Sequence, residues 1–238
     1  MKTIFSNYIS SKVHDTFQSN SESDNANYIP FITFSREYGC GGDHITQKIC
    51  SVLSSCSGSD GKVYEWKRIN HEVIAEAAAE IGVPAEIVKE MTYQKIDEYF
   101  VSSFFNFSFS KYSKPSVDTV RNAIARVIAK FAHEGRVIIL GRGGASITRH
   151  YKNSLHIRLH APIEWRVKQV AEREDISIEK AKVLIHKIDS ERSSLRNYFE
   201  GTATDKTIFD AIYNSMTLSE DEIIESILAI ARKKGFIS

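Results

Sequence analysis

The stretch with the clearest chemical potential is FSREYGCGGDH, residues 34–44, where three glycines separate an apolar run from a helical pattern. A strand, a glycine turn and a helix in succession direct several backbone N–H groups at one point, and a phosphate group suits that point. The standard phosphate-binding loop reads G-x-x-x-x-G-K-[ST]. Here Gly42 stands at the lysine and Asp43 follows it. On the pattern alone, a tight strand-to-helix turn capped by Asp43 remains an alternative.

A second glycine-rich turn, Gly141-Arg142-Gly143-Gly144, directly follows the apolar run 137–140. An arginine at the carboxyl end of a strand lies where α/β sheets bind ligands, and its guanidinium group can hold a phosphate with two hydrogen bonds. The alternative is a surface arginine paired with a carboxylate. Residues 141–146 also match part of a dinucleotide-binding motif, but the next strand lacks the acidic residue that this motif requires. We therefore reject a dinucleotide site.

A third group of basic residues lies on the long helix predicted over 177–199 and consists of Lys187, Arg192 and Arg196. The last two are four residues apart and share a face, so they repel each other unless an anion or a carboxylate lies between them. Asp189 and Glu191 are near enough to give an ordinary salt-bridged surface. Further candidates are Arg36, beside the first glycine turn, and more weakly Arg166 and Arg173 on the preceding helix.

Strand-like and helix-like segments alternate along the chain, which predicts a parallel sheet of about five strands covered on both faces. The predicted strands are 28–34, 63–69, 137–140, 154–161 and 207–213. The predicted helices are 43–53, 71–82, 84–100, 116–134, 162–173, 177–199 and 219–231. The serine- and asparagine-rich residues 1–27 show no apolar period and are expected to form a mobile tail.

Composition sets broad limits on function. The 238 residues are 42% hydrophobic and 26% charged with a net charge of +1, so general attraction to nucleic acid or to an anionic membrane is not expected. We find no secretory signal and no apolar run of about 20 residues, and the three cysteines lack metal-ligand spacing. These features predict a cytoplasmic protein, in which Cys40 is simply a small residue that fits its turn.

Five segments, in order, resemble the cytidylate kinase-like family over residues 29–234. They are FITFSREYGCGGDHITQKIC, RINHEVIAEAAAEIGVPAEIVKEM, RVIILGRGGASI, KIDSERSSLRNYF and TIFDAIYNSMTLSEDEIIESI. That family opens with S-R-E-x-G-x-G-G and already lacks the lysine. Two positions depart from the family pattern: Asn70 replaces a usual aspartate, and Gly143 replaces the aspartate of the G-R-D motif found in cytidylate kinases.

The resemblance implies a three-layer α/β P-loop kinase fold with a helical lid. Residues 28–238 would form this domain, with 71–134 covering the acceptor site and 175–205 forming the lid. The implied reaction moves the γ-phosphate of ATP, bound with Mg²⁺, to a nucleoside monophosphate, with CMP or dCMP as the first candidates. Two alternatives stay open: a kinase of this fold with another small acceptor, as Gly143 suggests, or a regulator that binds nucleotides without turnover, as Gly42 suggests.

The resemblance also implies a role for each candidate residue. Arg142 would hold the acceptor, Arg192 and Arg196 would neutralise the migrating group, and Arg36 is a candidate substitute for the missing lysine. The donor phosphates would lie against the turn and the helix start, which comprise Gly39, Cys40, Gly41, Gly42, Asp43 and His44. No metal ligand is assigned, although Asp43 is the nearest guess. The aromatic segment Phe100–Tyr112 is expected in the core, with an acceptor pocket or a subunit interface as alternatives, and the oligomeric state stays open.

Overall fold

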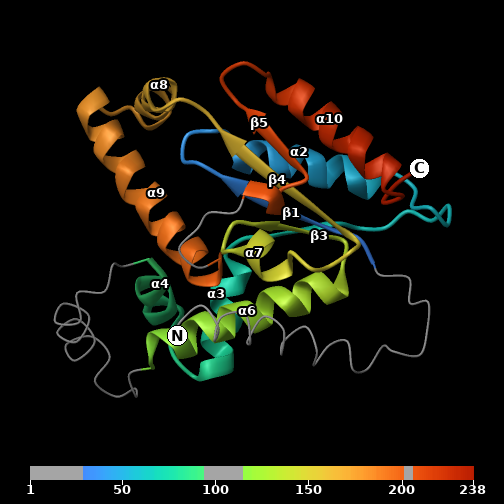
Figure 1. Ribbon diagram of the computed structural model, residues 1–238, viewed down its shortest axis with the longest axis horizontal. Helices are drawn as coiled ribbons and strands as arrows, with labels where there is room; N and C mark the ends of the chain where they lie inside the picture. The colour runs from blue at the N-terminus through green and yellow to red at the C-terminus, as the bar shows by residue number, and fades with distance from the viewer. Residues whose placement is uncertain (1–28, 94–114, 201–205) are drawn as a thin grey trace.

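The computed structural model describes residues 29–93, 115–200 and 206–238. The predicted tail and the aromatic segment Phe100–Tyr112 lie outside these residues. One parallel sheet, with strand order β2-β3-β1-β4-β5, runs through the molecule (Figure 1). Its strands are β1 (Phe31–Arg36), β2 (Lys67–Ile69), β3 (Val137–Leu140), β4 (Ser154–His160) and β5 (Ala211–Asn214). The α/β class and the five parallel strands are therefore confirmed.

Three strands differ from the prediction by more than one residue at one end or both. β1 begins after Pro30, because the proline has no N–H group to donate to a neighbouring strand. At its other end the strand continues to Arg36. In the segment predicted over 63–69, Val63 instead forms an isolated antiparallel bridge with Ser57, and only Lys67–Ile69 joins the sheet. Near the C-terminus, Lys206–Ile208 forms a 3₁₀ turn (η1), so β5 starts later than expected.

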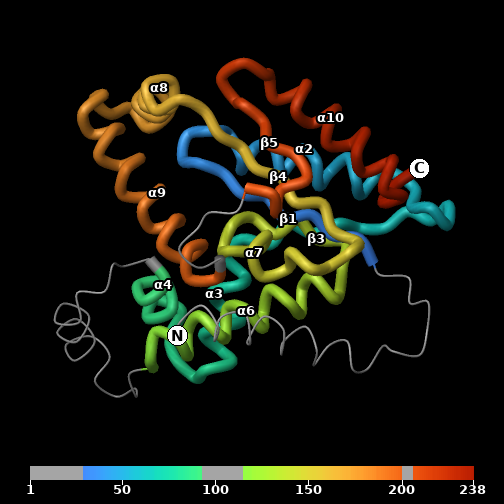
Figure 2. Tube along the Cα trace, in the orientation of Figure 1, coloured from blue at the N-terminus to red at the C-terminus, as the bar shows by residue number. Residues whose placement is uncertain are grey.

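Helices cover both faces of the sheet (Figure 1). One face packs against α2 (Gly42–Ser55) and α10 (Glu220–Lys233). The other packs against α3 (Glu72–Ile81), α4 (Ala85–Tyr93), α6 (Val117–Glu134) and α7 (Gly144–Thr148). Between β4 and η1 the chain forms the α8–α9 hairpin, which consists of α8 (Ile163–Glu174) and α9 (Ile178–Glu200). Figure 2 shows α9 running from α8 down to the neighbourhood of α7 and α4.

Local sequence signals explain where several helices begin and end. Ser116 caps α6 by accepting a hydrogen bond from the backbone N–H of Thr119, and Ser219 and Glu222 form the predicted capping box of α10. Gly82 ends α3 in the left-handed conformation that glycine adopts without strain. These stops and starts agree with the sequence because they depend on neighbouring residues only.

The site is positioned by the order of the strands. β1 lies at the centre, between β3 and β4, and all three run in the same direction. The chain leaves β1 toward β2 and β3 on one side and later continues with β4 and β5 on the other side. In open parallel sheets, ligands bind beyond the carboxyl ends of the strands where the order reverses in this way. Here that point is the end of β1, at Arg36.

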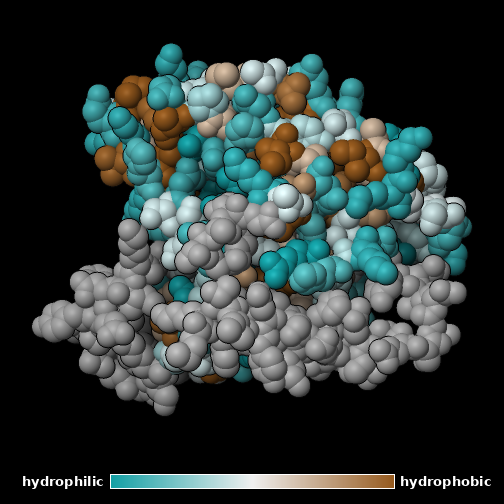
Figure 3. Space-filling view, in the orientation of Figure 1, coloured by the Kyte–Doolittle hydropathy of each residue, from teal (hydrophilic) through white to brown (hydrophobic). Residues whose placement is uncertain are grey.

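The outward face of α9 is partly apolar. Hydrophobic side chains gather over the α8–α9 hairpin in Figure 3, and Ile178 and Val183 of α9 are 49% and 70% exposed. Lys187 borders the same shallow surface depression as Val183. None of the helices in the described ranges is long and apolar enough to cross a lipid bilayer.

His156 is a buried titratable residue of β4, only 4% exposed, and its ring contacts Thr33 Oγ1 at 2.7 Å and Ser154 Oγ at 3.0 Å. Burial lowers the pKa of His156 to about 4, against the opposing charge of Asp210, while Lys234 adds to the lowering. In the unfolded chain His156 takes up a proton near pH 6.5, whereas in the folded chain it stays neutral down to about pH 4. Stability should fall by about 3 kcal/mol between pH 7 and pH 4 from this group alone.

The His156→Gln variant, which keeps a hydrogen-bonding side chain, should lose that part of the acid sensitivity. Urea unfolding of both proteins at pH 4 to 7 would measure it, with a shallower pH dependence expected for the variant. Parallel pH dependences would mean that His156 contributes nothing to acid unfolding.

Candidate functional site

The turn between β1 and α2, residues 37–41, is the glycine loop. Gly39 has φ +95° and Gly41 has φ +71°, a backbone region that other residues rarely adopt. A Cβ atom on Gly39 would also lie 3.1 Å from Val170 and 3.2 Å from Arg166, so α8 packs directly against the loop. Cys40 is 2% exposed, and burial raises the pKa of its thiol to about 11. This agrees with Cys40 as a small residue that fits, rather than a reactive one.

Compared with the standard phosphate-binding loop, the basic residue and the first glycine are interchanged in this chain. In G-x-x-x-x-G-K-[ST], Arg36 stands at the first glycine and Gly42 at the lysine. A Cβ atom on Gly42 would lie 3.1 Å from Arg36 Cγ, so the Arg36 side chain crosses the space that a lysine at 42 would need. Its guanidinium group reaches Gly141, where a Cβ atom would collide with Arg36 Nη1. The positive charge that the lysine would give at the end of the loop therefore comes from Arg36, at its beginning.

The turn after β3 is strained at Arg142. Gly141, Arg142 and Gly143 all have left-handed backbones, with φ of +78°, +57° and +76°. For a side-chain-bearing residue this conformation costs roughly 1 to 2 kcal/mol, and such residues are enriched at functional sites. The strain directs attention to Arg142, which the sequence had already marked.

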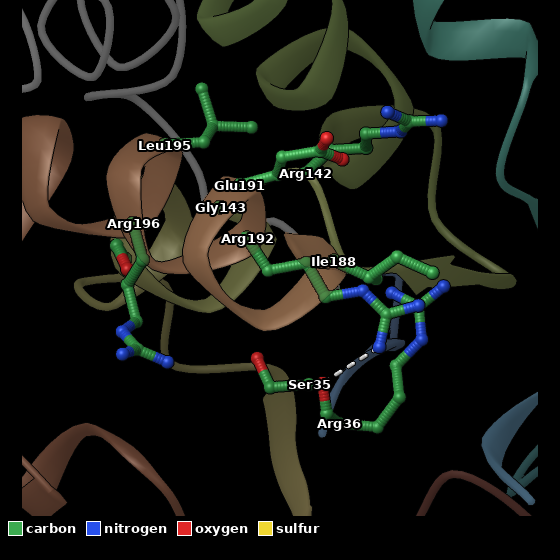
Figure 4. A pocket seen from close by; sticks show the side chains of 11 residues that line it. Ser35, Arg36, Arg142, Gly143, Ile188, Glu191, Arg192, Leu195 and Arg196 are labelled. Carbon is green, nitrogen blue, oxygen red and sulfur yellow. Dashed lines mark hydrogen bonds between the residues drawn. The ribbon is translucent and has the colours of Figure 1, made fainter. Parts of the chain in front are cut away.

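The ends of β1 and β3 meet the middle of α9 around a cavity of about 150 Å³. Four arginines, two serines and one glutamate are among its lining side chains: Arg36, Arg142, Arg192, Arg196, Ser35, Ser146 and Glu191. In Figure 4, the side chains of Arg36 and Arg192 point toward one another, and a dashed line marks the hydrogen bond from Arg192 Nη1 to the backbone oxygen of Arg36, 3.2 Å long. All four arginines predicted as catalytic thus border one cavity, while their catalytic roles stay predictions.

The electrostatics of this cavity favour an anion. Burial, together with the charges of Arg192 and Arg142, lowers the pKa of Arg36 to about 9. Burial and Arg192 lower the pKa of Arg142 to about 10, and burial lowers that of Arg192. Within the described part of the chain, no carboxylate forms an ion pair with Arg36 or Arg192. A phosphate between these guanidinium groups would relieve both the repulsion and the desolvation.

A larger groove of about 870 Å³ runs along the glycine loop. Its walls come from the loop, the start of α2, α8 and the segment between β5 and α10. Arg36 and Arg192 line both this groove and the smaller cavity. The two spaces therefore meet at these two arginines, as expected where one group passes from a donor to an acceptor.

Asp43 and His44 line the groove, but their side chains have other partners. Asp43 Oδ1 lies 2.6 Å from Arg68 Nη1, and His44 Nδ1 lies 2.5 Å from Glu220 Oε2. The alternative in which Asp43 caps the helix is wrong, because the N-cap of α2 is Gly41 and no side chain caps it. Asp43 instead occupies the first turn, where its charge favours the helix N-terminus.

The remaining basic candidates do not enter the cavity. Arg166 is buried against the glycine loop and Asp189, and Arg173 lies at the edge of the groove beside Glu174. Lys187 faces the outer surface of α9. Helical spacing alone could not separate these residues from the cavity arginines, because basic residues on one helix need not share a partner.

Two contributors were not singled out from the sequence. Arg68 on β2 pairs with Asp43, and Glu220 at the start of α10 places Oε1 3.1 Å from where a Cβ atom of Gly41 would lie. The parallel sheet was the available signal, since segments that follow β2 and β5 must reach the same edge as the glycine loop. Their exact side-chain reach depends on packing.

Few side chains along the groove could bind a divalent cation. No cluster of three histidine, cysteine, aspartate or glutamate side chains among residues 29–93, 115–200 and 206–238 could hold a metal ion. Magnesium in kinase sites usually relies on one or two protein oxygens, substrate phosphates and water. Asp43, in the wall of the groove, supplies one such carboxylate. The residues present thus fit a nucleotide-bound Mg²⁺ better than a metal held by protein alone.

Comparison with known proteins gives a consistent result. Residues 31–217 match the cytidylate kinase-like family. A cytidylate kinase of Methanopyrus kandleri is 33% identical over 132 residues, covering 51% of this chain and 67% of the relative. A cytidylate kinase of Ignicoccus hospitalis is 23% identical over 156 residues, covering 65% and 88%.

Among solved structures, an uncharacterized protein from Eubacterium ventriosum has a TM-score of 0.57 and 19% identity. The superposition covers 86% of this chain and 98% of that one, and it bears on the fold alone. Together with the matched family and the five-stranded parallel sheet, it agrees with the predicted α/β P-loop kinase fold.

Proposed function

Since the chain belongs to the cytidylate kinase-like family, we propose that it transfers the γ-phosphoryl group of ATP to a nucleoside monophosphate, with CMP or dCMP as the first candidates. Family and fold support a nucleotide kinase, and the acceptor is the proposed part. The observation that carries the proposal is that Arg36, Arg142, Arg192 and Arg196 all line one cavity beside the glycine loop. A cytoplasmic location stays a prediction.

The donor phosphates would lie in the larger groove. The backbone of residues 39–42 and the N-terminus of α2 supply N–H groups and the positive end of a helix dipole. Arg36, which crosses Gly42, would contact the outer phosphates in place of the loop lysine. Asp43, whose Oδ1 pairs with Arg68, would hold the nucleotide-bound Mg²⁺ through its other carboxylate oxygen, and the ion would neutralise charge on the phosphate oxygens.

The acceptor phosphate would lie in the smaller cavity against Arg142. Phosphoryl transfer needs positioning and charge neutralisation more than covalent help from the protein. Arg192 and Arg36 border both spaces, so they would stabilise the phosphoryl group while it passes between them. Arg196 lines the acceptor side and would add charge there.

One contact favours a second candidate function, a kinase of this fold with another small acceptor. A Cβ atom on Gly143 would lie 2.8 Å from Cδ2 of Phe199, so the Phe199 ring covers the position where cytidylate kinases carry the G-R-D aspartate. An aspartate at 143 would not fit while Phe199 keeps its place. The acceptor is therefore expected to bind without a carboxylate at this point.

ADP formation by the purified protein, with ATP and Mg²⁺, tests the proposal. CMP, dCMP, UMP, AMP and GMP would be offered separately, beside a reaction without acceptor. Turnover that requires one nucleotide supports the proposed function and identifies the acceptor. If no nucleotide supports turnover but ATP still raises the melting temperature, a different acceptor or a binding-only regulator replaces it.

Arg142→Ala should raise the KM for the acceptor by roughly 10- to 100-fold, the loss expected for hydrogen bonds to a charged group. The KM for ATP should change little, because Arg142 does not line the donor groove. Steady-state kinetics with each substrate varied would show this, and thermal unfolding would confirm that the variant folds. An unchanged acceptor KM would remove Arg142 from the acceptor site.

A further inference from the structure

Tyr38, in the glycine loop, is bound on both sides of its peptide backbone by the α8–α9 hairpin. Its N–H group donates to Asp189 Oδ1 at 2.8 Å, and its carbonyl oxygen accepts from Arg166 Nη1 at 3.1 Å. Asp189 belongs to α9 and Arg166 to α8. Two helices thus hold a single residue of the loop by its main chain, whatever its side chain.

Asp189 and Arg166 also bind each other. Arg166 Nη1 lies 2.6 Å from Asp189 Oδ2, and Arg166 Nε donates to the backbone oxygen of Ala161 at 3.0 Å. Arg166 is 7% exposed, whereas the Asp189 side chain is 25% exposed, so the pair is partly buried. The two carboxylate oxygens of Asp189 are therefore divided between the loop and α8.

Further contacts keep the loop close to the hairpin. The guanidinium carbons of Arg173 and Arg192 lie 5.4 Å and 5.5 Å from the centre of the Tyr38 ring, within the range of cation–π attraction. Arg192, about one helical turn after Asp189 in α9, donates to the backbone oxygen of Arg36. α9 therefore contacts the backbone at two places, the Tyr38 N–H in the loop and the Arg36 carbonyl at the end of β1.

We propose that Asp189 is a positioning residue that fixes α9 to the glycine loop through Tyr38 and Arg166, and so sets Arg192 beside Arg36. Its catalytic consequence rests on the proposed function, but its effect on phosphate binding does not require turnover. In this view α9 and the glycine loop form one binding unit before any substrate arrives.

Removing Asp189 should change the affinity for a polyphosphate in opposite directions under a positioning role and under simple Coulomb attraction. Asp189 carries a negative charge close enough to Arg192 to influence its pKa. Removing that charge should tighten the binding of a polyphosphate if Coulomb attraction alone matters. If Asp189 positions the arginines, removing it should weaken binding, because the guanidinium groups lose their common geometry.

The test uses the full chain and inorganic tripolyphosphate as the probe, titrated calorimetrically at constant ionic strength. Asp189→Asn keeps an oxygen for the Tyr38 N–H group but turns an amide N–H toward Arg166. Asp189→Ala removes both contacts. Glu179→Gln, the same charge change on an exposed residue of α9, is the matched control.

We expect Asp189→Asn to weaken tripolyphosphate binding about tenfold and to lower kcat, while the Glu179→Gln control stays within twofold of wild type. Equal or tighter binding by a folded Asp189→Asn protein would overturn the proposal. If the Ala variant does not fold, the Asn variant decides. Wild type that binds no tripolyphosphate and forms no ADP would refute the proposed function, and this inference with it.

Non-additivity separates positioning from general destabilisation. If Asp189 acts through Arg192, Asp189→Asn should reduce kcat in wild type but have little further effect in Arg192→Ala. Full additivity of the two losses, at equal thermal stability, would contradict the proposed route through Arg192.

Discussion

Replacing Arg36 with methionine is expected to lower kcat by about 10³, in the range reported for arginines that stabilise phosphoryl transfer. Methionine retains the apolar part of the side chain that packs over Gly42 but removes the guanidinium group. Arg36 borders both the groove and the cavity, so the loss of its guanidinium group affects both spaces. Steady-state ADP formation would measure the loss.

The same variant should be more stable than wild type. Burial and the charges of Arg192 and Arg142 lower the pKa of Arg36, which means that its charge is unfavourable in the ligand-free fold. Removing one like charge should raise the melting temperature by about 2 to 4 °C, corresponding to roughly 1 kcal/mol for a chain of this size. A drop in both activity and melting temperature would instead indicate a structural role.

A compensating pair of changes tests the exchange between Arg36 and Gly42. Arg36→Gly combined with Gly42→Lys rebuilds the spacing G-x-x-x-x-G-K and should recover at least tenfold of the activity lost by Arg36→Gly alone. Gly42→Lys by itself should be impaired, because a side chain there meets Arg36. No recovery in the double variant would mean that Arg36 does not substitute for the loop lysine.

Replacing Arg192 with alanine is expected to lower kcat by about 10² to 10³ while the KM for ATP rises less than tenfold. Arg192 lies between the two spaces, so its charge would matter most when the phosphoryl group is between donor and acceptor. Arg192→Lys should recover only part of the loss, since lysine lacks the planar fork that also holds the Arg36 carbonyl.

Lys187→Ala is the matched control for Arg192→Ala. It removes a positive charge from the same helix, but Lys187 borders the outer depression instead of the cavity. Its kcat should stay within twofold of wild type. If Lys187→Ala and Arg192→Ala lost activity equally, the total charge of α9 would matter, and the placement of Arg192 would not.

Local sequence was sufficient for the framework of the fold. The run Val137–Leu140 is fully buried as predicted, and the stops at Gly82 and the capping box at Ser219 lie where their neighbours dictate. The order of strands and helices led to the parallel sheet because each element buries a face that its own apolar pattern defines. Boundaries moved by a few residues where pairing with a distant strand, or its absence, decided the end of an element.

The sequence also marked the arginines that line the cavity, but it could not separate them from the other basic candidates. Arg142 and Arg192 share a cavity with Arg36, whereas Arg166 binds the loop backbone and Lys187 faces outward. Charge and spacing are the same for a ligand-binding arginine and for one that supports a loop. What separates them is the segment that each side chain meets in the fold. Arg166, for example, binds Tyr38, which lies more than 100 residues earlier in the sequence.

By itself, the sequence determined the α/β order, the two glycine turns and the arginines beside or within them. The tertiary structure alone decided that Arg36 crosses Gly42, that Phe199 covers Gly143, and that Asp189 joins α9 to the glycine loop. The physical reason is that apolar periodicity and capping act within a few residues, while these contacts depend on how the ends of β1 and β3 meet α9. Only the packed sheet brings those segments together.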